Sequence, residues 1–190
     1  MDLEKLAKDV MWLKDIEEIK QLQYEYMYLL GTFGSGKKVA DLFTDDGKAE
    51  IQDSGIFQGK KAIAWFFDEI DAAGYEGVIK NYQYTMTQGE YPILWPGECL
   101  AANPRIKING ITAKGQWFMF GFYTLPYADG LKAIWNAGKY ENEYKKVDGV
   151  WKISFLHFLT NFETTYEQGW AKQPMICSYA RFGEQLRKKK

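Results

Sequence analysis

The sequence predicts an α+β fold in which helices pack on one face of a curved antiparallel sheet. Apolar residues recur every three or four positions up to residue 73, which is typical of amphipathic helices. Farther along the chain, apolar and polar residues alternate between hairpin dipeptides, which is typical of strands. The 190 residues fit one domain, and neither an internal repeat nor a linker divides them.

Three helices are predicted in the first part. One spans the first thirty residues, with Gly31 as its C-cap and these side chains on one face: Leu3, Leu6, Val10, Leu13, Ile16, Ile19, Leu22, Tyr26 and Leu29. A short helix at 38–43 ends at a turn formed by 45–47, and 48–57 reads as a strand. The third helix, about Lys60–Ala73, has a buried side made of Ile63, Phe66, Phe67 and Ile70.

The second part is predicted to form a meander of long strands. Residues 91–104 should be largely loop, because they contain Pro92, Pro96, Gly97 and Pro104. Two strand pairs follow, joined by Asn109-Gly110 and Asp148-Gly149: Arg105–Ile108 with Ile111–Thr124, and 133–147 with 150–162. We expect one domain over 1–163 and a C-terminal extension or arm over 164–190, which packs on a neighbouring subunit or covers a pocket mouth.

Charge and composition exclude several classes of partner. With 24 basic and 25 acidic residues and no basic stripe, the chain is not expected to bind nucleic acid. It has neither a signal peptide nor an apolar stretch long enough to cross a bilayer, so we expect a cytoplasmic protein without membrane contact. Two cysteines and one histidine do not make a metal centre. The 17% aromatic content suits either a packed core or a ligand cavity.

Four segments, taken in order over about residues 15–160, carry a family resemblance. They are Tyr24-Glu25-Tyr26; Leu42-Phe43-Thr44-Asp45-Asp46-Gly47 leading to Gln58-Gly59-Lys60; 103–115; and 137–153. With them the chain resembles the nuclear transport factor 2-like, or SnoaL-like, superfamily of polyketide cyclases, scytalone dehydratases and bile-acid dehydratases. The resemblance implies a cone-shaped barrel of a curved sheet packed on three N-terminal helices, and a homo-oligomer, dimer or trimer.

The resemblance also assigns residues of the dehydratase branch, which uses a His–Asp pair for acid–base catalysis. Tyr26 falls on the branch's first-helix tyrosine. The aspartate that partners the histidine falls on Gly31, the histidine falls near Cys99, and a pocket aspartate falls near Gly121. A literal copy of the His–Asp pair is therefore absent, and the superfamily also contains non-catalytic binding domains.

Alternation along the strands predicts the residues that line a pocket. One inner set is Asn136, Gly138, Tyr140, Asn142 and Tyr144. Its amides and phenols either satisfy one another or orient a ligand carbonyl or hydroxyl. The other inner set is Gly115, Trp117, Met119, Gly121 and Tyr123. The two glycines of the second set either leave space for an apolar ligand or let the strand bend.

Two side chains are candidates for chemistry. His157 shares an alternation with Trp151, Ile153 and Phe155, so we expect it to face the core, either as a neutral packed side chain or as a proton shuttle paired with Tyr26 or Asn136. Cys99 is either a buried inert thiol or, if neighbours lower its pKa, a nucleophile.

The first functional hypothesis is a cofactor-independent lyase or isomerase acting on an apolar aromatic or polycyclic small molecule. Its catalytic residues would be His157 and Tyr26, and its substrate-binding residues Cys99, Trp117, Met119, Gly121, Tyr123, Asn136, Tyr140 and Asn142. No cofactor is expected. The spacing at 31–37 matches a phosphate-binding loop, but it continues with Lys38 and follows a helix, so it does not predict nucleotide binding. The alternatives are a non-catalytic small-ligand-binding or accessory domain, and a module whose sheet serves oligomerisation.

Overall fold

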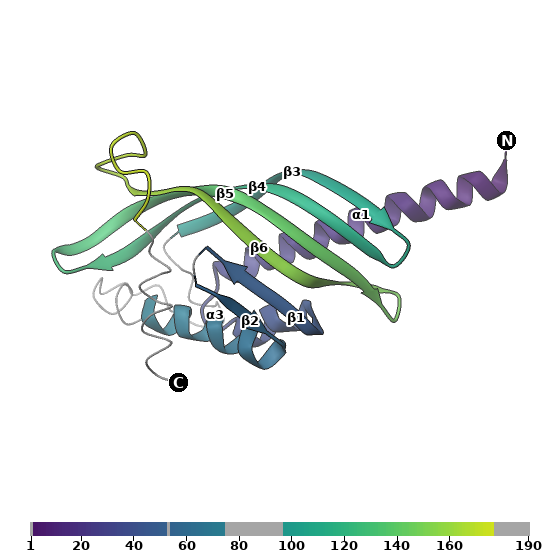
Figure 1. Ribbon diagram of the computed structural model, residues 1–190, viewed down its shortest axis with the longest axis horizontal. Coiled ribbons are helices and arrows are strands. Elements are labelled where there is room, and N and C mark those ends of the chain that lie inside the picture. The colour runs from purple at the N-terminus through teal and green to yellow at the C-terminus, as the bar shows by residue number, and fades with distance from the viewer. Residues whose placement is uncertain (1, 53, 75–96, 177–190) are drawn as a thin grey trace, which may run out of the picture.

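The computed structural model describes residues 2–52, 54–74 and 97–176 (Figure 1). Three helices and six strands make up this part of the chain. In order they are α1 (Leu3–Leu30), α2 (Gly36–Asp41), β1 (Phe43–Ile51), β2 (Ile56–Gln58), α3 (Lys60–Gly74), β3 (Gly97–Asn109), β4 (Thr112–Tyr127), β5 (Gly130–Val147) and β6 (Val150–Thr165).

The six strands form one sheet in the order β2-β1-β6-β5-β4-β3. Neighbouring strands are antiparallel except β1 and β6, which run parallel. Figure 1 shows the long strands β3–β6 arching over α1 and α3. The predicted α+β fold, with helices on one side of a curved sheet, is confirmed, and so are the hairpins at Asn109-Gly110 and Asp148-Gly149.

Helix α1 begins and ends where the sequence predicts. The Asp2 carboxylate accepts hydrogen bonds from the backbone N–H groups of Glu4 and Lys5 at 3.0 and 3.1 Å, which caps the first turn. The helix ends at Gly31. Only its second half is buried, with Ile19 and Tyr26 fully enclosed, while residues 2–14 stay exposed.

The segment after α1 differs from prediction in its boundaries. Helix α2 begins two residues earlier than expected, and the predicted turn at 45–47 lies inside β1. A register shift between Phe43 and Lys48 absorbs these residues as an irregularity in the strand, which is why they resemble a turn. The single strand predicted at 48–57 is two strands, since the chain reverses between β1 and β2, and Gln52 and Gly55 have positive φ there.

The loop predicted at 91–104 is partly wrong. Residues 97–104 belong to β3, whereas 91–96 lie outside the described residues. Pro104 is tolerated because β3 is an edge strand and its register shifts between Ala102 and Arg105, with Asn103 at φ 52°. At a bulge in an edge strand, the backbone N–H that proline lacks is not needed for a hydrogen bond to a neighbouring strand. Pro104 therefore lies in a strand and not in the predicted loop.

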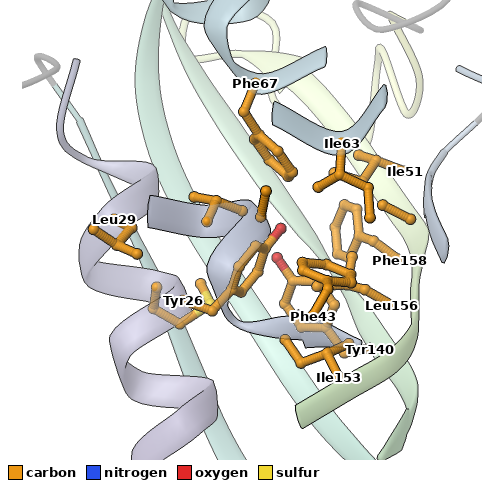
Figure 2. Packing of buried hydrophobic residues seen from close by; sticks show 14 of the residues in the cluster. Tyr26, Leu29, Phe43, Ile51, Ile63, Phe67, Tyr140, Ile153, Leu156 and Phe158 are labelled. Atoms are coloured by element: carbon orange, nitrogen blue, oxygen red, sulfur yellow. The ribbon is translucent and has the colours of Figure 1, made fainter. Parts of the chain in front are cut away.

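The core fills the space between the helices and the inner face of the sheet. In Figure 2 side chains from α1, α3 and the strands meet there, among them Ile63, Phe67, Leu156 and Phe158. Phe57 and Phe66 stack with ring centroids 4.1 Å apart, which joins β2 to α3. Among the described residues, no helix has both the length and the apolar character to cross a membrane.

The chain beyond β6 folds back toward the sheet. Met175 forms a parallel bridge with Glu163, and the Gln173 side-chain oxygen accepts a hydrogen bond of 3.0 Å from the backbone N–H of Thr165. Thus 166–176 packs on the end of β6. The rest of the predicted extension, 177–190, lies outside the described residues, so its expected role as an arm or pocket cover stays a prediction.

Candidate functional site

A cavity of about 90 Å³ lies between the inner face of the sheet and helices α1 and α3. Its walls are mostly apolar, and they are formed by Tyr26, Leu30, Gly31, Ser35, Ile51, Phe67, Ile70, Asp71, Gly97, Glu98, Cys99, Met119, Tyr123, Leu125, Asn136, Tyr140 and Phe158. Six of the ten residues predicted to form the site are among these: Tyr26, Cys99, Met119, Tyr123, Asn136 and Tyr140.

The register of β4 and β5 explains this convergence. Gly121 pairs with Asn136 and Trp117 pairs with Tyr140, so the inner residues of the two strands lie side by side. Burial alternates along both strands, with Met119, Asn136 and Tyr140 on the buried face. The predicted inward orientation of both sets is confirmed, because these strands alternate regularly over this stretch.

One end of the cavity is polar. Asn136 Nδ2 donates a hydrogen bond of 2.9 Å to the Tyr123 hydroxyl, and this hydroxyl donates a short hydrogen bond to Glu163 Oε1. Asn136 and Glu163 are 1% and 0% exposed, so the three side chains form a buried chain of hydrogen bonds. Asn136 Oδ1 accepts no hydrogen bond from the part of the chain that the structure describes. A ligand donor could satisfy it.

Two phenols meet at the cavity wall. Figure 2 shows the hydroxyls of Tyr26 and Tyr140 pointing toward one another, and the rings are edge to face at 5.9 Å. Burial raises the pKa of Tyr26, and the neighbouring Tyr140 hydroxyl offsets only part of that rise. Within the described residues the Tyr26 hydroxyl makes no hydrogen bond of good geometry. Tyr26 is therefore a neutral phenol at the cavity wall, with the Tyr140 hydroxyl as its neighbour.

Cys99 is a half-buried thiol that lies against a glycine. Burial raises its pKa to about 12, so it is not the thiolate that a nucleophile requires. A Cβ on Gly121 would lie 2.8 Å from Cys99 Sγ. At Gly115 a Cβ would come within 2.9 Å of the Tyr144 ring. Both glycines therefore permit close packing. Neither leaves open space for an apolar ligand, so that expectation is wrong.

A second carboxyl reaches the cavity from α3. Asp71 accepts hydrogen bonds from the backbone N–H groups of Gly34 and Ser35 at 2.9 and 3.4 Å. Burial raises its pKa to about 6, despite these two donors, and the nearby Asp68 adds to the rise. Asp71 is thus a group that changes protonation near neutral pH at the cavity wall.

Two of the predicted binding residues lie deeper in the core, in a network that is already satisfied. Trp117 Nε1 donates to the Tyr144 hydroxyl at 3.0 Å, and Asn142 Nδ2 donates to Gln23 Oε1 at 2.8 Å. The Tyr144 hydroxyl also donates to Gln23 Oε1, at 3.2 Å. Trp117 and Asn142 therefore hold α1 against the sheet and do not line the cavity. In this network the inner amide and phenol satisfy other side chains and do not orient a ligand.

The expected inward orientation of His157 is wrong. Tyr144 pairs with Ile153, whereas Glu143 pairs with Phe155, so the register of β6 slips by one residue between them. This bulge reverses the alternation, so Leu156 and Phe158 are buried instead. His157 stacks on Phe155 at 5.5 Å and lies 3.7 Å from Glu50, in a hollow of the outer face. The structure does not bring it together with Tyr26.

Sequence reasoning did not single out Glu163 or Asp71. A second shift in β6, between the pairs Ala137–Phe162 and Gly138–Thr160, restores the original alternation and turns Glu163 inward opposite Asn136. The period-two pattern that wrongly placed His157 inward would have placed Glu163 correctly. Asp71 carries no comparable signal, because it lies on the third helix among other charged residues.

The positions that the resemblance assigned to the His–Asp pair do converge. Gly31 and Cys99 both line the cavity, although neither can do acid–base work at neutral pH. Glu98 Oε2 lies 3.6 Å from the position of a Cβ on Gly31, so a carboxylate from β3 occupies the space beside the missing aspartate. The two positions thus meet at the cavity, but they carry other groups than the resemblance implies.

Comparison with known proteins supports the fold. The family model described as SnoaL-like domain matches residues 12–157. Among solved structures, LinA, a hexachlorocyclohexane dehydrochlorinase, is 18% identical with a TM-score of 0.64, covering 83% of this chain and 92% of that one. No curated protein matches the chain.

Of two other similar structures, one is named as a candidate enzyme and the other has no known function. A candidate scytalone dehydratase from Novosphingobium aromaticivorans is 19% identical with a TM-score of 0.60, covering 81% of this chain and 89% of that one. The Mycobacterium tuberculosis protein Rv3472, of unknown function, is 22% identical with a TM-score of 0.58, covering 80% and 78%. At these identities the likeness establishes the fold, and activity has to be argued from the site.

Proposed function

Since the chain belongs to the SnoaL-like domain family, we propose that its cavity binds a small, largely apolar molecule and moves a proton on it, as a cofactor-independent lyase or isomerase. The observation that carries this proposal is the buried chain Asn136–Tyr123–Glu163 at one end of an otherwise apolar cavity. Such a site binds an apolar body and positions one polar group of the ligand.

The cavity's size limits the ligand. A buried apolar cavity of about 150 Å³ accommodates benzene, and this one measures about 90 Å³. A single ring with one hydroxyl or carbonyl would enter if the flexible Met119 side chain, which lines the wall, moved slightly. The polycyclic substrates considered from the sequence would need a much larger rearrangement. We therefore propose a substrate of about one ring.

The buried groups suggest how a proton would move. The Tyr123 oxygen would take a proton from a substrate carbon next to a carbonyl, while the Tyr123 hydroxyl proton passes to Glu163. The electron pair of the broken C–H bond moves toward the carbonyl oxygen, where Tyr26 would donate a hydrogen bond without giving up its proton. Return of the proton to another carbon completes an isomerisation. If a leaving group departs with its bonding electrons instead, the reaction is an elimination.

This assignment keeps Tyr26 and replaces His157. His157 was expected to act as the base, but its side chain lies on the outer face beside Glu50. Glu163 is the carboxylate connected to the cavity by a hydrogen bond, through Tyr123. The relatives named as a dehydrochlorinase and as a candidate scytalone dehydratase support elimination as the reaction class.

Binding without turnover is the second candidate function. It is favoured by Cys99 and Gly31, which stand where the resemblance expects the catalytic pair and cannot act as acid or base at neutral pH. The two functions differ in one measurable event, which is removal of a proton from carbon.

The experiment uses cyclohexanone, phenol and benzene as probes. We expect cyclohexanone and phenol to raise the melting temperature more than benzene, because only they carry a group for Tyr26 or Asn136. In D₂O the protein should also accelerate exchange of the α-protons of cyclohexanone, followed by NMR. Binding of cyclohexanone without accelerated exchange would favour the binding domain, and no thermal shift with any probe would overturn the proposal.

Three variants assign the roles. Glu163→Gln should abolish the exchange while cyclohexanone still raises the melting temperature, because the amide fills the same volume but cannot accept the proton. Tyr26→Phe should reduce both the rise in melting temperature with cyclohexanone and the exchange of its α-protons, without destabilising the ligand-free protein. His157→Ala is the matched control, and it should leave both unchanged. A loss of exchange in His157→Ala with normal exchange in Glu163→Gln would reverse the assignment.

A further inference from the structure

The first turns of α1 project into solvent as an arm. In Figure 1 the N-terminal part of α1 extends beyond the ends of the long strands. Residues 3–14, about 18 Å of helix, are exposed throughout. The body first holds the helix at Asp15, whose carboxylate accepts hydrogen bonds from Trp151 Nε1 at 2.9 Å and from Lys146 Nζ. The arm is therefore a rigid continuation of a helix that is anchored at its base.

An apolar seam runs along this arm. Leu3, Leu6, Val10 and Leu13 are spaced by three, four and three residues, so they lie within an arc of about 80° on the helix. Their exposed fractions are 71%, 43%, 55% and 58%. This spacing places them at positions a, d, a and d of two heptads, the pattern by which helices pair.

The protein's own body does not cover the seam. Asp15 and Ile19, which contact the body, lie about 140° and 180° around the helix from Val10. The seam ends after Leu13, because the next a and d positions are Glu17 and Lys20, which pair with each other at 3.0 Å. The apolar surface is thus limited to the arm and faces away from the sheet.

We propose that this seam pairs in parallel with the same seam of a second copy of this chain. Val at an a position with Leu at d positions favours two strands. The flanking charges favour the same arrangement. Asp9 is at position g and Lys14 at position e of the next heptad, so each Asp9 would face Lys14 of the other copy. An antiparallel pair would instead bring the two Asp9 carboxylates together.

Parallel pairing makes the contact self-complementary and closed. The two-fold axis runs along the arms, so the same residues from each copy meet and this contact joins two copies and no more. Two heptads bury little surface compared with a standard interface. We therefore expect an association that depends strongly on protein concentration. It is independent of the cavity and of the function proposed for it.

Sedimentation over a range of protein concentrations tests the seam. Leu6→Glu should lower the association constant about tenfold or more, because it places a charge in the apolar seam. Met11→Glu is the matched control, since Met11 is 65% exposed but lies outside the seam. Equal association in both variants and the parent chain would overturn the proposal. Circular dichroism should show that helix content is unchanged in both variants.

Charge reversal tests the orientation. Asp9→Lys alone and Lys14→Asp alone should each weaken association, because each brings like charges together. The double variant should restore it. If the double variant associates no better than either single one, the parallel register is wrong.

A cross-link gives an answer that does not depend on affinity. In a Cys177→Ser background, Val10→Cys places two thiols opposite one another in the parallel register, and mild oxidation should join most of the chains in pairs. Met11→Cys should cross-link far less. Equal cross-linking at both positions, or none at Val10→Cys, would overturn the proposed pairing.

Discussion

The Tyr123 hydroxyl donates a hydrogen bond to Glu163 Oε1 and thereby joins β4 to β6 across the intervening strand β5. The side chain of that middle strand, Asn136, donates to the same hydroxyl at 2.9 Å. Three adjacent strands are therefore linked at the polar end of the cavity. Since Glu163 is fully buried, the bond should matter for stability as well as for chemistry.

Removing this donor should destabilise the fold. We expect Tyr123→Phe to lower the free energy of unfolding by about 1–3 kcal/mol, because a buried carboxylate and the Asn136 amide each lose a partner. Urea denaturation measures the change. Tyr28→Phe is the control, since Tyr28 is 80% exposed, and it should have almost no effect. Equal unfolding midpoints for the two variants would contradict a structural role for this bond.

The network around Gln23 should contribute more stability than one hydrogen bond. Gln23→Ala leaves the Asn142 amide and the Tyr144 hydroxyl without their shared acceptor and opens a gap between α1 and the sheet. We expect a loss of about 2–4 kcal/mol in the free energy of unfolding. Gln21→Ala, on the exposed side of the same helix, separates this effect from helix propensity. A loss below about 1 kcal/mol would mean that the network is dispensable.

Asp71 should make stability depend on pH. Its pKa is about 6 in the folded protein against an ordinary value of 3.8, so the folded state binds this proton more tightly than the unfolded chain. Its contribution is complete below pH 3.8 and is lost as the pH rises through about 6. Asp71→Asn should therefore be more stable than the parent chain at pH 7–8, by about 1–3 kcal/mol, and should match it near pH 4.

The measurement is thermal or urea unfolding of both proteins across that pH range. Asp41→Asn is a control in which the pH dependence of stability should change in the opposite direction. The Lys37 side chain lowers the pKa of Asp41, so this carboxylate stabilises the fold at neutral pH and stops doing so on acidification. A parent chain and an Asp71→Asn variant with parallel pH profiles would contradict the assigned protonation of Asp71.

The outer face of the sheet offers a second surface for self-association. Phe118, Phe120 and Phe122 are 54%, 38% and 45% exposed along β4, and Trp135 lies against Phe120 with ring centroids 5.2 Å apart. We propose that this face forms the oligomer that the family resemblance leads us to expect. Phe120→Glu should then reduce the mass in light scattering, whereas Gln116→Glu, a polar neighbour on the same face, should not. An unchanged mass for Phe120→Glu would exclude this face.

The sequence by itself determined the fold and much of the cavity wall. Local signals suffice for α1, for the hairpins at 109–110 and 148–149, and for the inward side of β4 and β5, because those strands alternate without interruption around the cavity. Tyr26, Met119, Tyr123, Asn136 and Tyr140 followed from that alternation and from the resemblance.

Only the tertiary structure decided which groups meet. Two register shifts in β6 turn His157 outward and Glu163 inward, and such shifts depend on how a strand fits its neighbours, which a period-two pattern does not contain. The approach of Asp71 to the cavity likewise depends on where α3 packs against the α1–α2 turn. Local periodicity fixes the face of an element, whereas long-range packing fixes the chemistry of the site.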